Sequence, residues 1–276
     1  KRDIEAFFAN SLWFGFTGTP IFEANKYEQK GDLAQTTQQL YGNCLHSYTI
    51  KEAIHDGAVL GFMVETLGKN GLTPEEEELT YGKEAHMRQV LDVILNKSFA
   101  KFGMEKGRGE TYEAMFTVSS IEQAQKYYEL LKSIKVGKDE LKISDDIRRA
   151  LPDFPKFAIT YSVTENDEAS KLNQDKMKEA LDDYNDMFGT NYNLAGINAY
   201  NANLNDRLAL KEKKYLNRSQ QLDIVIVVDR LLTGFDAPCL STLFIDRQPM
   251  SPQNLIQAFS RTNRLFDTKK QYGQIV

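Results

Sequence analysis

The sequence lacks three features that would each point to a particular class of protein. No apolar run approaches the roughly 20 residues that a membrane-spanning helix needs. The 276 residues include two cysteines, Cys44 and Cys239, far apart in the chain, which favours a reducing, cytoplasmic setting over a disulfide framework. Basic residues are not in excess, because 34 Lys and Arg face 39 Asp and Glu, for a net charge of −5. That balance argues against a generic basic nucleic-acid-binding protein, but it does not exclude a local groove of phosphate contacts.

Several catalytic patterns are also missing. There is no Gly-x-x-x-x-Gly-Lys-Ser/Thr phosphate loop and no Asp-Glu magnesium motif after a strand. Cys44-Leu45-His46 offers too few ligands for a zinc site, which needs four. Residues 182–186 do not fit a calcium loop, and His86 has no evident partner. We therefore predict no metal site in the sequence, and neither a Ser-His-Asp arrangement nor a nuclease carboxylate motif is recognisable.

The composition, with 41% hydrophobic and 26% charged residues, is that of a globular protein of one or two domains. Apolar segments typical of buried strands alternate with segments of helical periodicity. This alternation predicts an α/β fold, with a parallel sheet covered by helices on both faces. Strands are predicted at residues 11–17, 57–65, 111–118, 156–162, 223–228 and 243–245. Helices are predicted at residues 32–41, 87–102, 120–131 and 164–188, and residues 191–205 are expected to form an Asn-rich loop.

Two segments near the C-terminus carry the most chemical information. The first runs from Val228 to Pro238 and places a Gly-Phe-Asp turn after a buried strand. The second, from Gln257 to Arg264, places two arginines three residues apart on a predicted helix, where they share one face. Arginine is a planar cation suited to phosphate oxygens, so the two segments predict half of a nucleoside-triphosphate site. The alternative is a pair of surface arginines that interact with a helix end.

The second segment resembles motif VI of superfamily 2 helicases and translocases, Gln-x-x-Gly-Arg-x-Gly-Arg. Gln257, Arg261 and Arg264 match this pattern, while Ser260 and Asn263 replace its two glycines. The match is thus strongest at the charged positions.

Three further segments extend the resemblance in the same order along the chain. Gly234 and Asp236 match motif V, residues 15–20 (Gly-Phe-Thr-Gly-Thr-Pro) resemble motif III, and the strand, Ser119-Ser120 and helix resemble motif IV. Among superfamily 2 branches, the chain looks most like the motor (restriction) subunit of type I restriction-modification enzymes.

The resemblance implies a specific organisation. Residues 1–66 would be the remnant of a first RecA-like lobe with motif III, residues 67–83 an inter-lobe linker, and residues 84–276 the second RecA-like lobe with motifs IV to VI. We expect a fragment of a longer polypeptide, because the chain begins close to motif III and stops within a strand-like stretch. The phosphate loop, the metal-binding acid and the nuclease motif would then lie upstream, and the fragment alone would lack ATPase and nuclease activity.

The resemblance also implies roles for the matching residues. Arg264 would be an arginine finger and Arg261 its partner at the γ-phosphate of ATP, and a finger can be worth about 10³–10⁵ in rate. Gly234 would serve backbone geometry and Gln257 would communicate with the phosphates. Asp236 would either read the nucleotide sugar or bind local backbone N–H groups as a structural residue.

Other positions would connect ATP to DNA. Thr17 and Thr19 would couple the nucleotide state to DNA grip, or else form an ordinary Thr-Gly-Thr-Pro turn. Hydroxyl, backbone and guanidinium groups at strand ends would hold DNA phosphates. These DNA candidates are Ser119, Ser120, Thr160, Ser162 and Arg230, the last of which is equally a candidate for a solvated surface residue.

The leading hypothesis is the second motor lobe of an ATP-dependent double-stranded DNA translocase that acts in type I restriction. ATP and Mg²⁺, bound mainly by the missing first lobe, would be its cofactors, and the specificity and methyltransferase subunits its partners. Two alternatives remain. An RNA helicase or remodelling motor would respond to RNA or nucleosomes, and a non-catalytic binding module would show no ATPase activity.

Overall fold

The structure is a computed structural model that describes residues 2–8, 10–26, 31–67, 80, 83–103, 112–162, 168–232, 234–247 and 250–276. The chain forms two compact units, residues 1–55 and residues 56–276. Among the described residues, no helix is both long and apolar enough to cross a membrane.

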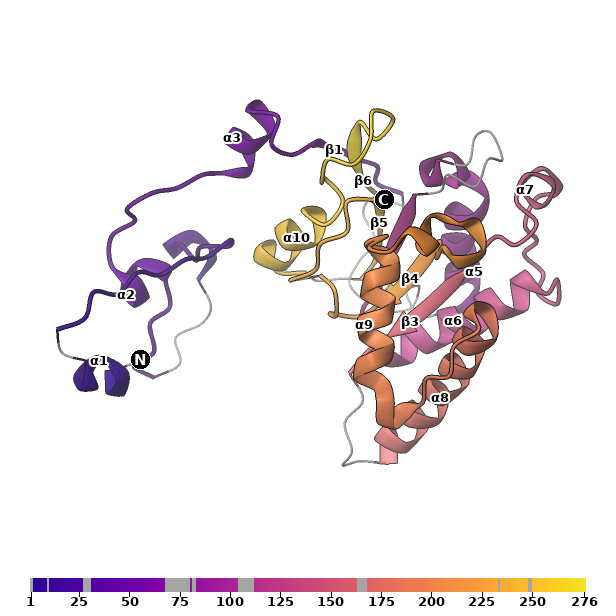
Figure 1. The fold of residues 1–276 in the computed structure, drawn as a ribbon, viewed down its shortest axis with the longest axis horizontal. Helices are drawn as coiled ribbons and strands as arrows, with labels where there is room; N and C mark the ends of the chain where they lie inside the picture. The colour runs from indigo at the N-terminus through magenta and orange to yellow at the C-terminus, as the bar shows by residue number, and fades with distance from the viewer. Residues whose placement is uncertain are drawn as a thin grey trace. The chain divides into compact units, whose positions relative to one another are not determined.

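The N-terminal unit contains short helices joined by extended chain (Figure 1). Its elements are α1 (Arg2–Phe7), η1 (Glu23–Asn25), α2 (Thr37–Tyr41) and α3 (Ile50–His55). Helix α2 starts with a capping box, in which Thr36 and Gln39 each accept the backbone N–H of the other. The predicted helix at residues 32–41 is therefore confirmed only in its second half.

The strand predicted at residues 11–17 is wrong as a buried strand. No strand is present in this segment, and Leu12 and Phe16 are 87% and 93% exposed. A strand needs a neighbour to satisfy its backbone N–H and C=O groups, and apolar composition alone cannot supply one.

The C-terminal unit contains a six-stranded sheet in which all pairings are parallel (Figure 1). Its strand order is β1-β6-β5-β2-β4-β3. Strands β2, β3 and β4 are buried along their whole length, as expected for apolar runs in a sheet covered on both faces. The predicted α/β class is thus confirmed. The strands are β1 (Gly61–Val64), β2 (Glu113–Val118), β3 (Phe157–Thr160), β4 (Ile224–Val227), β5 (Leu240–Asp246) and β6 (Tyr272–Ile275).

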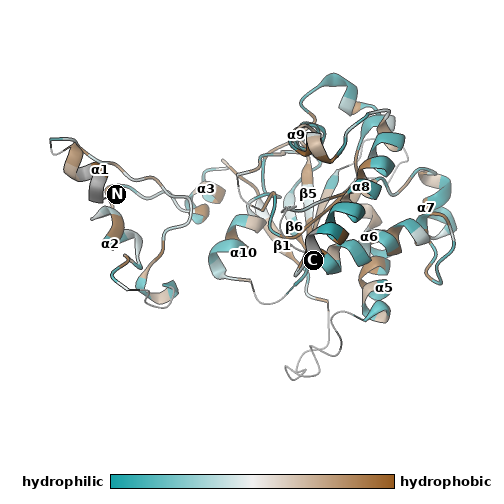
Figure 2. Cartoon of the chain, turned by 90° about the horizontal axis from the view of Figure 1, so that it is seen from below, coloured by the Kyte–Doolittle hydropathy of each residue, from teal (hydrophilic) through white to brown (hydrophobic). Residues whose placement is uncertain are grey.

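Helices surround this sheet, and Figure 2 shows hydrophilic residues concentrated on outer helices such as α8. The α-helices are α5 (Glu84–Asp92), α6 (Ile121–Lys135), α7 (Asp145–Ala150), α8 (Glu168–Phe188), α9 (Ile197–Leu208) and α10 (Pro252–Phe259). Shorter helical turns are η2 (Val93–Lys97), η3 (Phe99–Phe102), η4 (Leu194–Gly196), η5 (Lys213–Leu216) and η6 (Arg218–Gln220).

Helices α6 and α9 cover opposite faces of the sheet. On β3, Phe157 packs edge-to-face against Tyr128 of α6, with ring centroids 5.1 Å apart. Three residues further along the strand, and so on the other face, Thr160 lies 2.8 Å from the Asn201 amide oxygen of α9. The strands are therefore held between two helical layers.

Helix α9 corrects the loop predicted at residues 191–205. Its buried residues Tyr200, Leu204 and Leu208 follow a four-residue spacing, which forms one apolar helix face. Two of its asparagines, Asn201 and Asn203, have side-chain partners outside the helix backbone. Asn201 accepts from Thr160, and Asn203 accepts from Tyr184 of α8 at 2.8 Å.

One strand, β1, lies on the other side of the expected boundary between the two lobes. The expected scheme puts β1 with residues 1–66, whereas the structure pairs β1 with β6, Gly61 lying opposite Tyr272. Most of the expected linker at residues 67–83 lies outside the described residues. Which helicase lobe each unit represents remains a prediction.

Candidate phosphate-binding site at the carboxyl edge of the sheet

The candidate site lies where parallel strands end together. Strands β2, β4 and β5 finish at Val118, Val227 and Asp246, and their register places these ends at one edge of the sheet. Ligands of open α/β sheets bind at this carboxyl edge, in the loops that follow the strands.

The loop after β4 holds the Asp236 carboxylate between two buried residues. Leu231 and Gly234 adopt left-handed backbone conformations, with φ of 68° and 67°, and glycine meets this demand without steric cost. Phe235 and Ala237 are buried, while the side chain of Asp236 between them is 69% exposed. The turn therefore holds Asp236 at the surface on a fixed backbone.

Helix α10 supplies the second half of the site, but it is shorter than predicted. It starts at a Ser251 cap with Pro252 at the first helical position, and it ends at Phe259. Arg261 lies in the turn that follows, and Arg264 lies beyond it. The prediction that both arginines share a helical face is wrong.

The two arginines nevertheless meet on the same turn after β4. The Arg261 guanidinium donates to the Phe235 carbonyl, and its Nε donates to the Gln257 carbonyl at 3.1 Å. The Arg264 Nε lies 3.2 Å from Asp236 Oδ1. The structure thus brings together Arg261, Arg264 and Asp236, which sequence reasoning had placed in one site.

Electrostatics leave this cluster available to an anion. Burial lowers the pKa of Arg261, the positive charge of Arg264 lowers it further, and Asp236 raises it, but a guanidinium remains charged at neutral pH. The Arg264 side chain as a whole is 41% exposed, although its Nε is itself buried and has no hydrogen-bond acceptor in line among the described residues. A partly exposed ion pair of this kind is worth about 0–1 kcal/mol, so little free energy holds Arg264 against Asp236.

Comparisons with known proteins show the family to which the chain belongs. The profile of the type I restriction enzyme subunit R domain 3 family matches residues 110–276. The chain belongs to this family. The profile of the SWI2/SNF2 ATPase family matches residues 1–92.

Individual relatives are also named as subunits of type I restriction enzymes. The endonuclease subunit of type I restriction enzyme SsaAORF53P from Staphylococcus saprophyticus is 34% identical over 287 residues, covering 100% of this chain and 28% of the relative. The HindI endonuclease subunit from Haemophilus influenzae is 24% identical over 278 residues, covering 94% and 22% respectively. The chain thus spans about a quarter of the length of these curated relatives.

A solved structure supports the fold. A fragment assigned as an HsdR subunit of a type I restriction enzyme from Vibrio vulnificus aligns with a TM-score of 0.57 and 18% identity. The alignment covers 99% of this chain and 41% of that one.

In this R-subunit chain, the residues that replace the motif VI glycines hold the arginine loop in place. The Ser260 hydroxyl donates to the Ile256 carbonyl at 2.8 Å. Asn263 is buried and makes a two-point contact with Leu60, since its carbonyl accepts the Leu60 N–H at 2.7 Å and its side-chain amide donates to the Leu60 carbonyl at 3.2 Å. The departures from the helicase pattern therefore have structural roles.

The hydroxyls predicted to bind DNA after β2 are exposed at the start of α6. Ser120 caps this helix by accepting the Gln123 N–H at 3.1 Å, and the Ser119 hydroxyl donates to the Gln123 side chain at 2.6 Å. Both residues lie at the carboxyl edge, and their contact with DNA remains a prediction.

The remaining DNA candidates differ from one another. Ser162 is exposed after β3. Thr160 is 1% exposed and bonded to Asn201, which does not support a direct phosphate contact. Arg230 is partly buried after β4, and its Nε has no acceptor in the described part of the chain.

Thr17 and Thr19 belong to the N-terminal unit. The Thr19 N–H donates to the Thr17 hydroxyl at 3.2 Å, which is the local bonding of a threonine turn. Their proposed coupling to ATP remains a prediction.

Sequence reasoning missed Arg247, which braces the carboxyl edge. Its Nη1 donates to the Val228 carbonyl at 2.5 Å and to Asp229 at 2.9 Å, and lies 3.4 Å from the Thr117 hydroxyl. One side chain from the loop after β5 therefore joins the ends of β2 and β4. The Asp246-Arg247 pair directly after an apolar strand was the available signal.

Sequence reasoning also missed Asp246, which is the partner that His86 was expected to lack. Asp246 is buried and accepts from the Tyr127 hydroxyl at 2.5 Å and the Gln123 amide at 3.0 Å. His86 Nε2 lies 2.8 Å from the same carboxylate, so His86 does have a partner. Burial and the Asp246 charge raise the pKa of Tyr127, which keeps the phenol protonated as a donor.

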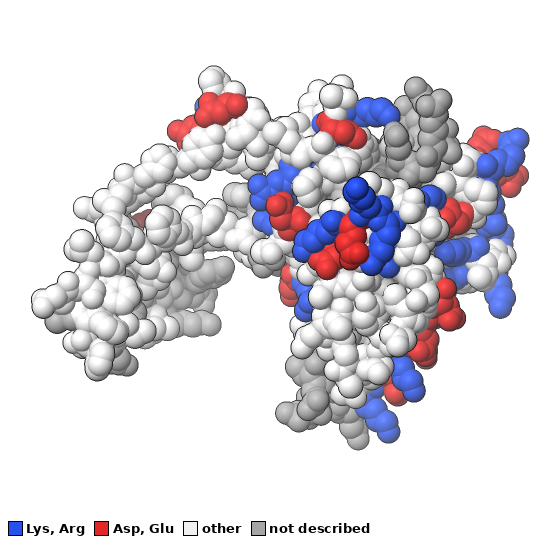
Figure 3. All heavy atoms as spheres, in the orientation of Figure 1, with Lys and Arg blue, Asp and Glu red and all other residues white. Residues whose placement is uncertain are grey.

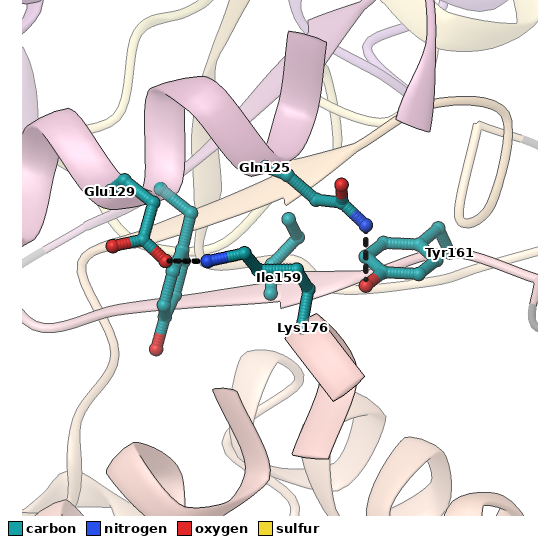
Figure 4. Close-up of a pocket in the computed structure, with 6 residues that line it drawn as sticks. Gln125, Glu129, Ile159, Tyr161 and Lys176 are labelled. Atoms are coloured by element: carbon teal, nitrogen blue, oxygen red, sulfur yellow. Dashed lines mark hydrogen bonds and ion pairs between the residues drawn. The ribbon is translucent and has the colours of Figure 1, made fainter. Parts of the chain in front are cut away.

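A small pocket elsewhere in the C-terminal unit is already satisfied internally (Figure 4). Its polar groups bond one another, with Gln125 donating to Tyr161 at 3.0 Å and Lys176 lying 3.3 Å from Glu129. It is lined by Gln125, Tyr128, Glu129, Ile159, Tyr161 and Lys176. Within the described ranges, no three His, Cys, Asp or Glu side chains are grouped to hold a metal ion.

Proposed function

We propose that this chain contributes the second RecA-like lobe to an ATP-dependent double-stranded DNA translocase, the motor of a type I restriction enzyme. Arg261 and Arg264 act on the γ-phosphate of ATP held by a first lobe, with Arg264 as the finger. The observation that carries this proposal is the meeting of both arginines with the turn of Asp236 at the carboxyl edge of the sheet.

The partial exposure of Arg264 supports this division of roles. Arg261 is tied to two carbonyls, so it is fixed before any ligand arrives. Arg264 holds a weak surface pair with Asp236, so it can turn toward phosphate when the site closes. A fixed and a releasable cation suit charge that develops during phosphoryl transfer.

The two lobes would bind different parts of ATP and its Mg²⁺. The described arginines suit the phosphate oxygens of ATP, whereas Mg²⁺ would be held by a first lobe together with the triphosphate. Gly234 shapes the turn, and Gln257 and Asp236 relay nucleotide state. Residues 1–276 alone then lack ATPase and nuclease activity.

DNA would be held at the same edge through Ser119, Ser120 and Ser162, by local hydroxyl and backbone contacts. The face of the protein in Figure 3 carries cations and anions side by side, which fits local phosphate contacts better than a broad basic surface. Specificity and methyltransferase subunits would complete the enzyme and select the DNA target.

The nucleic-acid dependence of turnover tests this function. We would measure steady-state ATPase of the complete gene product that contains residues 1–276 with no nucleic acid, duplex DNA or RNA, and displacement of a third strand from triplex DNA. We expect duplex DNA to stimulate ATPase and ATP to drive displacement. Stimulation by RNA alone would instead indicate a helicase of another branch, and no ATPase under any condition would indicate a binding module.

A further inference from the structure

Lys270 is a buried lysine in the loop between α10 and β6, and it contacts both halves of the candidate site. It is 4% exposed. Its ammonium donates to the carbonyls of Pro238 at 2.6 Å, Leu240 at 2.8 Å and Arg264 at 3.0 Å. An ammonium has three N–H donors, and here each has one carbonyl acceptor.

These three carbonyls join separate parts of the site. Pro238 follows the Asp236 turn, and Leu240 begins β5. Arg264 bears the proposed finger. One cation therefore sets the spacing between the backbone of the finger and the backbone of the turn that holds its Asp236 partner. Burying an ammonium is costly unless its donors are satisfied, and here all three donors have a carbonyl acceptor.

The rest of the loop holds Lys270 in position. Asp267 accepts the Lys270 N–H at 2.8 Å and the Lys269 N–H at 3.0 Å, and it also accepts the Tyr112 hydroxyl at 2.8 Å. On the other side of Arg264, Asn263 is fastened to Leu60. The finger is thus held on both sides by backbone contacts.

We propose that Lys270 is a positioning residue for the arginine pair, fixing the Arg264 backbone against the Asp236 turn so that the guanidinium meets phosphate in a reactive geometry. This role rests on the proposed ATPase function. A lysine outside motifs V and VI would then set the spacing between these two motifs.

Because Lys270 is titratable, this role predicts a specific dependence of turnover on pH. Burial lowers the pKa of Lys270 to about 8, with the nearby Arg264 lowering it and Cys239 and Asp267 raising it. A neutral amine has two N–H donors instead of three, so one carbonyl loses its partner as pH rises through this value. Turnover should therefore fall near pH 8.

Stability should change in the opposite direction. The folded pKa lies below the ordinary value of 10.5, so between these two values the unfolded chain binds more protons at this group than the folded chain. The contribution of Lys270 to folding stability therefore rises with pH across this window. If Lys270 only stabilised the fold, turnover would not fall over the pH range in which its contribution to folding stability rises.

The test compares wild type, Lys270→Met, Lys270→Arg and the control Lys269→Met, an exposed neighbour, all in the complete gene product. We would measure DNA-stimulated kcat and the KM for ATP from about pH 6.5 to 9.5, together with Tm. At pH 7 we expect Lys270→Met to lower kcat about 10- to 100-fold with little change in KM. Its remaining activity should lack the fall near pH 8, and Lys270→Arg should recover part of kcat and move the fall to higher pH.

Two results would overturn the inference while leaving the proposed function intact. One is a wild-type kcat that stays flat through about pH 9.5, a measurement that stands even if Lys270→Met does not fold. The other is a folded Lys270→Met protein with kcat within about twofold of the control. Absence of ATPase in wild type would instead remove the proposed function and, with it, the role of Lys270.

Discussion

Arg207 of α9 makes the sharpest prediction about stability. It is 1% exposed, and its guanidinium carbon lies 3.6 Å from the Phe188 ring centroid and 4.8 Å from that of Tyr215. Its Nε donates to the Tyr184 hydroxyl at 2.9 Å, and its Nη1 donates to the carbonyl and side chain of Gln220. A planar cation between aromatic rings thus joins α8, α9 and the approach to β4.

Replacing Arg207 with alanine removes these contacts together. Lost packing leaves a cavity, the ring contacts disappear, and the acceptors at Gln220 lose their donor. We expect a loss of about 3–5 kcal/mol, which corresponds to a fall in Tm of about 6–20 °C in a unit of this size. Arg207→Met keeps much of the volume without a buried charge, and we expect it to lose about 1–2 kcal/mol.

The assay is thermal unfolding of residues 1–276 followed by circular dichroism. Arg149→Ala is the matched control, because the Arg149 side chain is 77% exposed and contacts only nearby residues of its own helix, the Asp146 carboxylate and the Asp145 carbonyl, in the described structure. The control should stay within about 0.5 kcal/mol of wild type. The reasoning is refuted if Arg207→Ala melts with the control, or if Arg207→Met is as unstable as Arg207→Ala.

Two further substitutions test the arginine loop and the opposite edge of the sheet. Gly273→Ala places a Cβ 2.4 Å from the Thr262 hydroxyl, so we expect the free energy of unfolding to fall by about 1–3 kcal/mol and ATPase activity to fall with it. The control is Gly61→Ala on the paired strand, where the added Cβ meets no atom within 4 Å. Equal Tm values for the two variants would contradict the expected clash at Gly273. Burial raises the pKa of Glu113 well above 4.5, so its stabilising contribution is present below that value and is lost as pH rises. Glu113→Gln should therefore gain Tm relative to wild type as the pH rises above 4.5, and a constant Tm difference by differential scanning fluorimetry would exclude this account.

The sequence predicted the sheet well because burial leaves a local signature. The run Ile224–Val227 is apolar at every position, and the predicted strand at residues 223–228 brackets it closely. The helix predicted at residues 120–131 was confirmed and extended to Lys135, since both its Ser120 cap and its apolar spacing are local.

Long-range contacts explain where the predictions failed. The end of α10 at Phe259 is invisible in a pattern that spaces Arg261 and Arg264 as a helix would. What holds these arginines instead is the turn around Phe235, about 26 residues earlier in the chain. The His86–Asp246 contact spans 160 residues, which no short motif records.

The candidate site was predicted in its charged residues but not in its supports. Arg261, Arg264 and Asp236 meet as the motif resemblance implied. Arg247 and Lys270, which brace the edge and the loop, act through backbone carbonyls. Because every residue has a carbonyl, such contacts leave no side-chain pattern in a sequence.

The central claim is that Arg264 completes an ATP site that duplex DNA activates. The most direct measurement is DNA-stimulated ATPase of the complete gene product carrying Arg264→Ala, beside Arg149→Ala and wild type at equal folded fractions. Loss of an arginine finger predicts a fall in kcat of about 10³-fold or more in Arg264→Ala, with Arg149→Ala unchanged. Wild-type turnover in a folded Arg264→Ala protein would contradict the account.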